Sequence, residues 1–121
     1  MSEYHEPESE LSAQVRDQSR ALKSLKEEVE AIDWYNQRVD AATNQEIAAI
    51  MGHNRDEEIE HACMALEWLR RNMPGWDEEL RTYLFTTGDL TQMEEGEEGG
   101  SEGDGNSGDA GGSDLGIGSL K

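Results

Sequence analysis

Apolar residues recur at spacings of three and four along the first half of the chain, which is the pattern of an amphipathic helix. From about Leu11 to Ala42 there is no Pro or Gly, and Glu, Lys, Gln, Ala and Leu dominate. The apolar stripe of this run consists of Leu22, Leu25, Val29, Ile32 and Val39. This segment therefore predicts one long helix of the coiled-coil type.

A second helix is predicted directly after the first. Thr43-Asn44-Gln45-Glu46 has the S/T-x-x-E form of a capping box and precedes the next apolar positions. The helical pattern runs to about Asn72, where Pro74-Gly75 stops it. A connection this short forces the two helices to lie antiparallel. A third, shorter helix is predicted over Asp77–Phe85, with acidic residues in its first turn.

The composition changes abruptly after about Gln92. Residues 94–114 contain eight acids, no base and no large apolar side chain, which is typical of a disordered linker. The last seven residues, LGIGSLK, regain three aliphatic side chains, and such a tethered motif fits a peptide that docks into a partner's groove. A frayed terminus that happens to hold three aliphatics is the alternative.

We therefore divide the chain into a disordered N-terminal arm over residues 1–10, a helical hairpin domain over residues 11–90, a disordered acidic linker over residues 91–113 and a docking peptide over residues 114–121. The fold class is all-α, an antiparallel two-helix hairpin plus a short third helix.

The composition of the chain argues against several classes of function and predicts oligomerisation. Of the 121 residues 34% are hydrophobic, and the net charge is -18, so a single chain buries little apolar area and we expect it to oligomerise. The acidic balance argues against nucleic-acid binding. No run approaches the roughly 20 apolar residues of a membrane span, and the acidic N-terminus is not a signal peptide. The lone Cys63 suggests a reducing compartment. We expect a cytoplasmic protein without nucleic-acid or membrane partners.

The second helix carries charges on its apolar side. At about 100° per residue, Glu58 lies near the middle of the apolar arc and His61 about 60° to one side. An ionised Glu in a seam costs several kcal/mol unless something neutralises it. A buried polar pair with a structural role is the alternative to a metal ligand pair.

The first helix supplies a matching acid, since Glu28 borders its apolar stripe. A Glu from one helix and an inward Glu-x-x-His from the next are half of the ligand set of four-helix di-iron carboxylate proteins. Two hairpins related by a two-fold axis would complete a ferritin-like four-helix bundle with four carboxylates and two imidazoles. These ligands suit Fe(II), and Mn(II) nearly as well.

Several neighbouring residues have weaker claims. Tyr35 follows Glu28 by one heptad and could reach the metals, although a core tyrosine would look the same. Glu27 and Glu30 turn away from the seam and could attract incoming Fe(II). Three residues on the outer face of the second helix could hold a secondary cation such as Ca or Mn: His53, Glu57 and Glu60. The simpler interpretation is that this is a solvated charged face. Cys63 receives no role.

The runs EEVEAIDWYNQRVDA, HNRDEEIEHACMALEWLRRN and LRTYLFTTG resemble the encapsulated ferritins, the ferritin-like cargo of bacterial encapsulin nanocompartments. The terminal DLGIGSLK, residues Asp114–Lys121, is similar to encapsulin cargo-loading peptides. The similarity is dense over about residues 27–90 and follows the order and spacing of the three helices.

The resemblance implies a ferroxidase that oxidises Fe(II) with O₂ at a di-iron site between two chains, with dimers assembled into a decameric ring inside an encapsulin shell that stores the iron. Its implied metal ligands are Glu28, Glu58 and His61, with Tyr35 nearby. Its implied entry acids are Glu27 and Glu30, and its implied secondary site is His53, Glu57 and Glu60.

Two rival functions stay open on the sequence alone. The hairpin could bind metal without redox turnover, as an iron buffer or an oxygen-binding unit, although few histidines are available for the latter. It could instead be a structural helical cargo protein, with Glu58 and His61 a buried pair that sets register.

Overall fold

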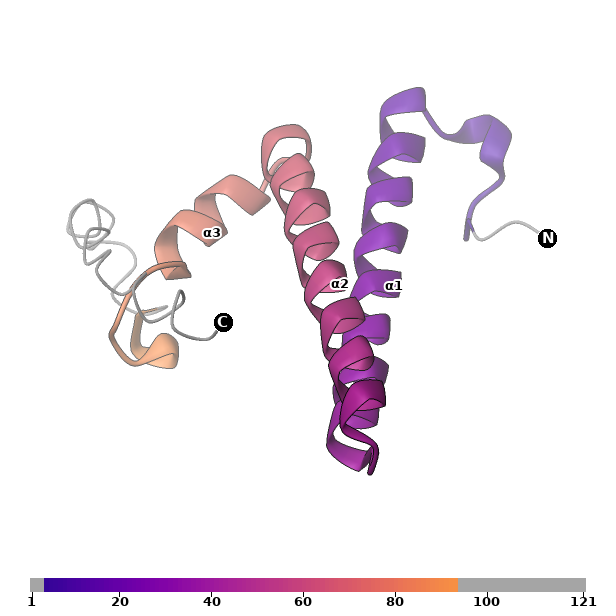
Figure 1. Cartoon of the computed structure of the whole chain (residues 1–121). Coiled ribbons are helices and arrows are strands. Elements are labelled where there is room, and N and C mark those ends of the chain that lie inside the picture. The colour runs from indigo at the N-terminus through magenta and orange to yellow at the C-terminus, as the bar shows by residue number, and fades with distance from the viewer. Residues whose placement is uncertain (1–3, 94–121) are drawn as a thin grey trace. The chain divides into compact units, whose positions relative to one another are not determined.

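The computed structural model describes residues 4–93, and the predicted linker and docking peptide, apart from residues 91–93, lie outside this range. The described part contains helices and no strand: the 3-10 helix η1 (Glu8–Glu10), α1 (Ala13–Ala41), α2 (Gln45–Asn72) and α3 (Trp76–Tyr83) (Figure 1). The chain divides into two units, Met1–Met73 and Pro74–Lys121. No helix in the described range is long and apolar enough to cross a membrane.

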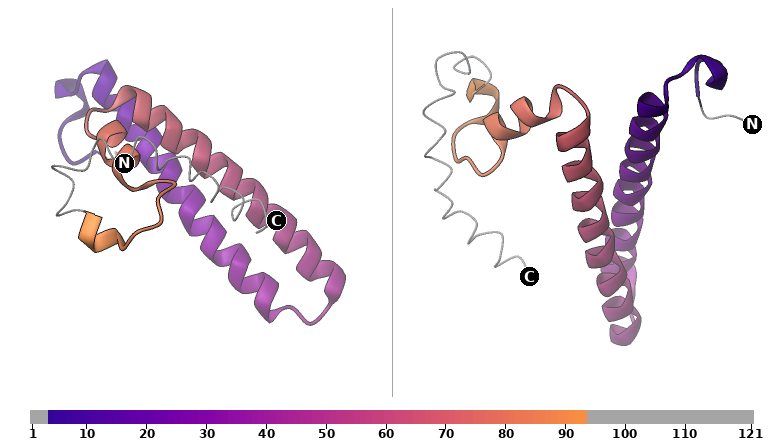
Figure 2. Two further views of the ribbon diagram at one scale, coloured as in Figure 1. Left: turned by 90° about the vertical axis from the view of Figure 1, so that its left-hand side faces the viewer. Right: turned by 90° about the horizontal axis from the view of Figure 1, so that it is seen from above.

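Helices α1 and α2 form the predicted antiparallel hairpin, and they lie side by side in every view (Figure 2). The Ser12 hydroxyl accepts a hydrogen bond from the Val15 amide at 3.1 Å and so caps α1. Only three residues separate the last residue of α1 from the first of α2, which leaves no room for another arrangement. The prediction of a hairpin is confirmed.

The start of α2 differs from the predicted capping box by one residue. Asn44 has extended backbone angles, and its Oδ1 accepts a hydrogen bond from the Ile47 amide at 2.9 Å. Asn44 is therefore the N-cap, and the box that began at Thr43 is wrong. The physical reason is that the cap must reach the amide three residues on, and Asn outranks Thr in this role.

The hairpin seam is thin. Among the described residues Leu69 is the one buried apolar side chain, and Gln18 is the one buried polar side chain. Gln18 donates from Nε2 to the Asn72 carbonyl at 2.8 Å, which satisfies one of the last carbonyls of α2. Many large apolar side chains of both helices stay exposed. The single hairpin thus has the incomplete core expected from its composition.

The N-terminal segment is joined to α1 by hydrogen bonds. Glu8–Glu10 form a turn of 3-10 helix, and the Arg16 Nη1 donates to the Leu11 carbonyl at 2.6 Å and the Glu8 carbonyl at 3.2 Å. A cation from the first turn of α1 thus binds carbonyl oxygens of the segment that precedes the helix, and the boundary of the predicted arm stays a prediction.

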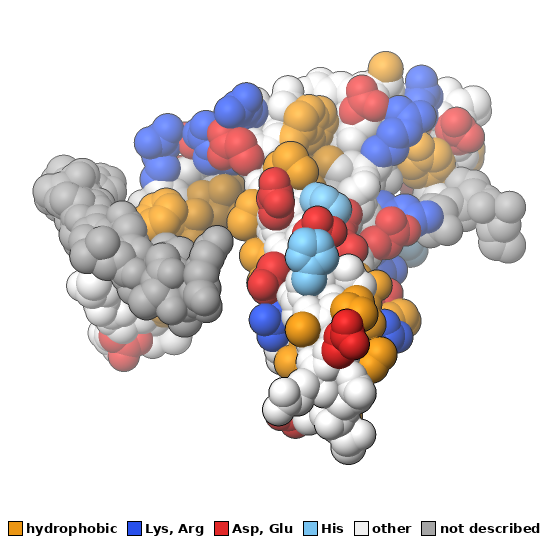
Figure 3. All heavy atoms as spheres, in the orientation of Figure 1, with side chains coloured by type: hydrophobic (Ala, Val, Ile, Leu, Met, Phe, Trp, Pro, Cys, Tyr) orange, Lys and Arg blue, Asp and Glu red, His pale blue; other side chains and the backbone are white. Residues whose placement is uncertain are grey.

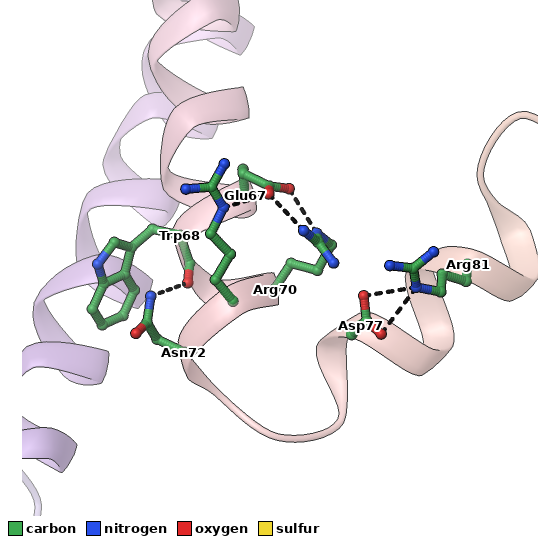
Figure 4. Close-up of polar contacts among 7 residues, drawn as sticks. Glu67, Trp68, Arg70, Asn72, Asp77 and Arg81 are labelled. Carbon is green, nitrogen blue, oxygen red and sulfur yellow. Dashed lines mark hydrogen bonds and ion pairs between the residues drawn. The ribbon is translucent and has the colours of Figure 1, made fainter.

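The end of α2 carries a cluster of ion pairs (Figure 4). Glu67 accepts from Arg70 Nε at 2.8 Å and from Arg71 Nε at 2.7 Å. Hydrogen bonds from these two guanidinium groups lower the pKa of the Glu67 carboxyl to about 2. Cations in the last turn of a helix also stabilise it, because they interact favourably with the negative end of the helix dipole.

Helix α3 is shorter than predicted and begins one residue earlier. It follows Gly75, whose φ of 103° favours glycine, and it is stabilised by a pair between Arg81 Nε and Asp77 Oδ1 at 2.9 Å (Figure 4). The predicted end at Phe85 is wrong, since Leu84 is extended and Phe85 has a φ of 60°.

Candidate metal centre

Three side chains of the hairpin converge on one point. Glu28 comes from α1, and Glu58 and His61 come from α2, and one ligand atom of each lies within 4.8 Å of the others. His61 Nδ1 is 3.7 Å from Glu28 Oε1 and 3.6 Å from Glu58 Oε1. Residues three apart on a helix share a face, which is why Glu58 and His61 present their donors together. These separations leave room for a cation between the donors.

The triad sits at the edge of the seam. The side chains of Glu28 and Glu58 are 24% and 25% exposed, and that of His61 is 46% exposed. Two carboxylates are therefore half-buried against the opposite helix, while the imidazole opens toward one face of the hairpin. The site can therefore be reached from outside a single chain.

The two carboxylates of the triad lie close enough to affect each other's ionisation. A side-chain hydrogen bond with Glu58 raises the pKa of Glu28, and desolvation and the negative charge of Glu58 raise it further, against a smaller lowering by His61. Two carboxylates this close repel each other when both are ionised. A divalent cation in this place would bind both carboxylates and remove their repulsion, so the donor set fits Fe(II) or Mn(II).

The other predicted site residues take separate places. Tyr35 is half-buried, and the Arg38 guanidinium lies 5.2 Å from the centre of its ring. Glu27 and Glu30 are exposed. Within residues 4–93, no group of metal-ligating side chains includes any of these three.

The outer-face trio is brought together only in part. His53 Nε2 lies 3.2 Å from Glu57 Oε2, with both side chains largely exposed, and Glu60 is exposed as well. The described residues place none of the three in a cluster of metal ligands. Cys63 is free and exposed.

Sequence reasoning missed a polar contact beside the triad. The Arg55 Nη1 donates to Asn36 Oδ1 at 3.0 Å and so joins α2 to α1. The available signal was the position of Arg55, three residues before Glu58 and thus on its flank.

Two exposed apolar side chains of α2 lie on the same side of that helix as His61, one toward each end of the helix. Ile50 and Trp68 are 11 residues before and seven residues after His61, so both lie within about 20° of it on the helix. Ile50 is 47% and Trp68 36% exposed. Figure 3 shows histidine and acidic side chains between hydrophobic patches on this face.

The fold is that of a ferritin-like hairpin, and a Glu from one helix with a Glu-x-x-His from the other could hold a metal ion. The chain belongs to the EncFtn-like family, whose sequence pattern matches residues 3–87. This membership supports an iron-related, ferritin-like function.

Individual relatives agree with the family. A "Ferritin-like protein" of Thermotoga maritima is 61% identical over 115 residues, which cover 95% of each chain. An "Encapsulated ferritin-like protein" of Rhodospirillum rubrum is 52% identical, over 97% of this chain and 86% of the relative. The crystal structure of a Nitrosomonas europaea protein matches with a TM-score of 0.71 and 55% identity, over 74% of this chain and 98% of that protein.

Proposed function

We propose that the protein is a ferroxidase, which oxidises Fe(II) to Fe(III) with O₂ at a di-iron site shared by two chains. The observation that carries this proposal is the triad of Glu28, Glu58 and His61, with ligand atoms within 4.8 Å of one another. Oxygen-rich sites with one imidazole per metal suit Fe(II).

The pairing of chains follows from the ligand count. One chain supplies two carboxylates and one imidazole, and a second chain on a two-fold axis would double this to four carboxylates and two imidazoles. Four negative charges balance two divalent cations. That is the ligand set of the di-iron carboxylate bundles, and the exposed apolar side chains around His61 would be covered in such a dimer.

The residues divide the chemical work as follows. Glu28 and Glu58 would both bind Fe(II), whose positive charge offsets the repulsion between the two carboxylates. His61 binds through a ring nitrogen. Two Fe(II) ions supply two electrons, enough to reduce one O₂ to hydrogen peroxide with two protons. Anionic oxygen ligands stabilise Fe(III) more than Fe(II), because the higher charge interacts more strongly, and so favour oxidation.

The remaining residues have supporting roles in this proposal. Tyr35, one heptad beyond Glu28, would donate to a ligand carboxylate. Glu27 and Glu30 would attract Fe(II) to the site. The outer trio of His53, Glu57 and Glu60 would hold a secondary cation such as Ca²⁺ or Mn²⁺.

The place of action is proposed from the relative's name and from the C-terminal sequence. The Rhodospirillum rubrum relative is named an encapsulated protein. Residues Asp114–Lys121 would dock to an encapsulin shell protein through Leu115, Ile117 and Leu120. Five dimers would form a ring inside that shell, within the cytoplasm, and the shell would store the oxidised iron.

The test is anaerobic loading with increasing Fe(II), followed by air and measurement of Fe(III) absorbance. We expect a fast rise in absorbance whose amplitude saturates at about one iron per chain. Glu28→Ala, Glu58→Ala and His61→Ala should each abolish it, and Cys63→Ala, a change at an exposed free thiol of the same helix, should not. Oxidation no faster than in buffer would favour a non-catalytic metal-binding or structural cargo protein.

A further inference from the structure

Apart from the contact of Glu28 with Glu58 inside the triad, a side-chain hydrogen bond joins α1 to α2 on each side of the triad. Gln18 and the Asn72 carbonyl meet at 2.8 Å at the open end of the hairpin. Arg55 Nη1 and Asn36 Oδ1 meet at 3.0 Å toward the end where the helices connect. Along α1, Glu28 lies between Gln18 and Asn36, so the two bonds bracket the ligands.

The Arg55 contact joins the two helices at the surface of the hairpin, where Asn36 is exposed and most of the Arg55 side chain is covered. Its side chain is 29% exposed, and its Nε also donates to Asp56 Oδ1 at 3.1 Å. A Cβ added to Gly52 would lie 3.8 Å from Arg55 Nη2 and 3.8 Å from Val39 Cγ2. These are ordinary van der Waals distances, so the guanidinium lies close to α2 near Gly52 and Val39, and two acceptors on different helices fix its orientation.

Arg55 links α2, which carries Glu58 and His61, to α1, and its side chain points away from these ligands. It precedes Glu58 by three residues, and His61 follows Glu58 by three, so the two lie on opposite flanks of Glu58 at about 60° each. Helical side chains lean toward the N-terminus of their helix, which directs Arg55 toward the connecting loop and away from the triad. The flank that bears His61 stays open to metal.

Axial register decides whether the triad can bind. Asn36 is eight residues beyond Glu28, or about 12 Å along α1 at about 1.5 Å per residue. A slip of one residue between the helices would move Glu28 by about 1.5 Å relative to Glu58 and His61. Metal–ligand distances tolerate only about 0.2 Å, so a bond that fixes register also fixes the ligand distances.

We propose that Arg55 and Asn36 are positioning residues of the metal site: their hydrogen bond holds α1 against α2 in the register that brings Glu28 to Glu58 and His61. This rests on the proposed function, since it takes the triad as the metal site. Neither residue touches the metal. Their effect passes through the helices.

The test measures Co(II) binding by its visible absorption, which reports ligand geometry without redox turnover. Asn36→Ala and Arg55→Met should each weaken Co(II) affinity by about 10-fold or more, the usual effect of losing a residue that orients ligands. Asn36→Asp should retain affinity, because a carboxylate also accepts from Arg55. The matched control is Gln37→Ala, which removes a bond at 3.1 Å to Asp33 within α1 alone and should leave affinity within about two-fold.

A double variant shows whether Asn36 and Arg55 act through the same hydrogen bond. If the two residues act through one bond, Asn36→Ala adds no further loss in the Arg55→Met background. Wild-type Co(II) affinity in both single variants, a further independent loss in the double variant, or no rescue by Asn36→Asp would overturn the proposal. Unchanged Co(II) binding by Glu58→Ala would instead refute the triad as the metal site, and with it both proposals.

Discussion

Without metal, the carboxylate of Glu28 destabilises the folded protein. Its carboxyl faces that of Glu58, and their hydrogen bond raises its pKa together with desolvation and the charge of Glu58. A group whose pKa is higher in the folded than in the unfolded chain stabilises the fold when protonated, and this contribution is lost as the pH rises through the folded value. At neutral pH without metal, ionised Glu28 is therefore unfavourable.

Glu28→Gln should stabilise the metal-free protein at pH 7.5 by roughly 0.5 kcal/mol, the size of a like-charge pair between neighbouring side chains. The advantage over wild type should shrink as the pH falls toward the unfolded value of 4.5, because protonation relieves the same repulsion in the wild type. Thermal unfolding in chelator across this pH range checks both points. The same variant should lose Co(II) binding. If the metal-free Glu28→Gln protein were less stable than wild type, the contact of Glu28 with Glu58 would be favourable even without metal.

At the scale of single elements, the cap of α2 tests how this helix begins. The Asn44 side chain accepts from the Ile47 amide at 2.9 Å, whereas Thr43 lies outside the helix. Asn44→Ala should destabilise the hairpin by about 1 kcal/mol, and Thr43→Ala, the adjacent control, should change stability by no more than about 0.5 kcal/mol. Urea unfolding of both variants gives the comparison. A larger loss for Thr43→Ala would restore the capping box predicted from sequence.

The helices could be predicted because periodicity and breakers act locally. The stripe of α1 and the Pro74-Gly75 stop after α2 located both long helices to within two residues. The ends were less certain. At α2 two adjacent residues can both cap, and sequence does not show which one adopts extended angles. At α3 the pattern continued through Phe85, whereas the chain leaves the helix at Leu84.

The triad could be predicted for a similar reason. An ionisable residue in or beside an apolar arc lies close to the neighbouring helix, and this applied to Glu58, near the middle of its arc, and to Glu28, at the border of its stripe. Their meeting needed only the antiparallel hairpin. The bond between Arg55 and Asn36 could not be foreseen, since it depends on the axial register of two helices, which no residue pattern within either helix encodes.

At the scale of the whole molecule, the described part of the chain has little apolar core of its own. One apolar side chain is fully buried, and large apolar residues on both hairpin helices are exposed, on a chain of net charge -18. A dimer that covers the face around His61 would supply the missing core and complete the ligand set. Folding, assembly and iron binding would then be coupled, because the surface that buries apolar area also holds the metal ligands.

Ile50→Asp tests this coupling, since Ile50 is 47% exposed and lies on the same face as His61. Desolvating an unpaired carboxylate in a dimer interface costs several kcal/mol, so the variant should be monomeric by native mass measurement where wild type is associated. Its unfolding temperature should no longer rise with protein concentration, and fast Fe(II) oxidation should disappear although all three ligands remain. Ala49→Asp is the matched control, because Ala49 is exposed in the same turn but lies about 180° from Glu58 on the helix; it should assemble and oxidise iron as wild type does. An Ile50→Asp monomer that still oxidised Fe(II) quickly would show that one chain suffices, and the shared di-iron site would have to be abandoned.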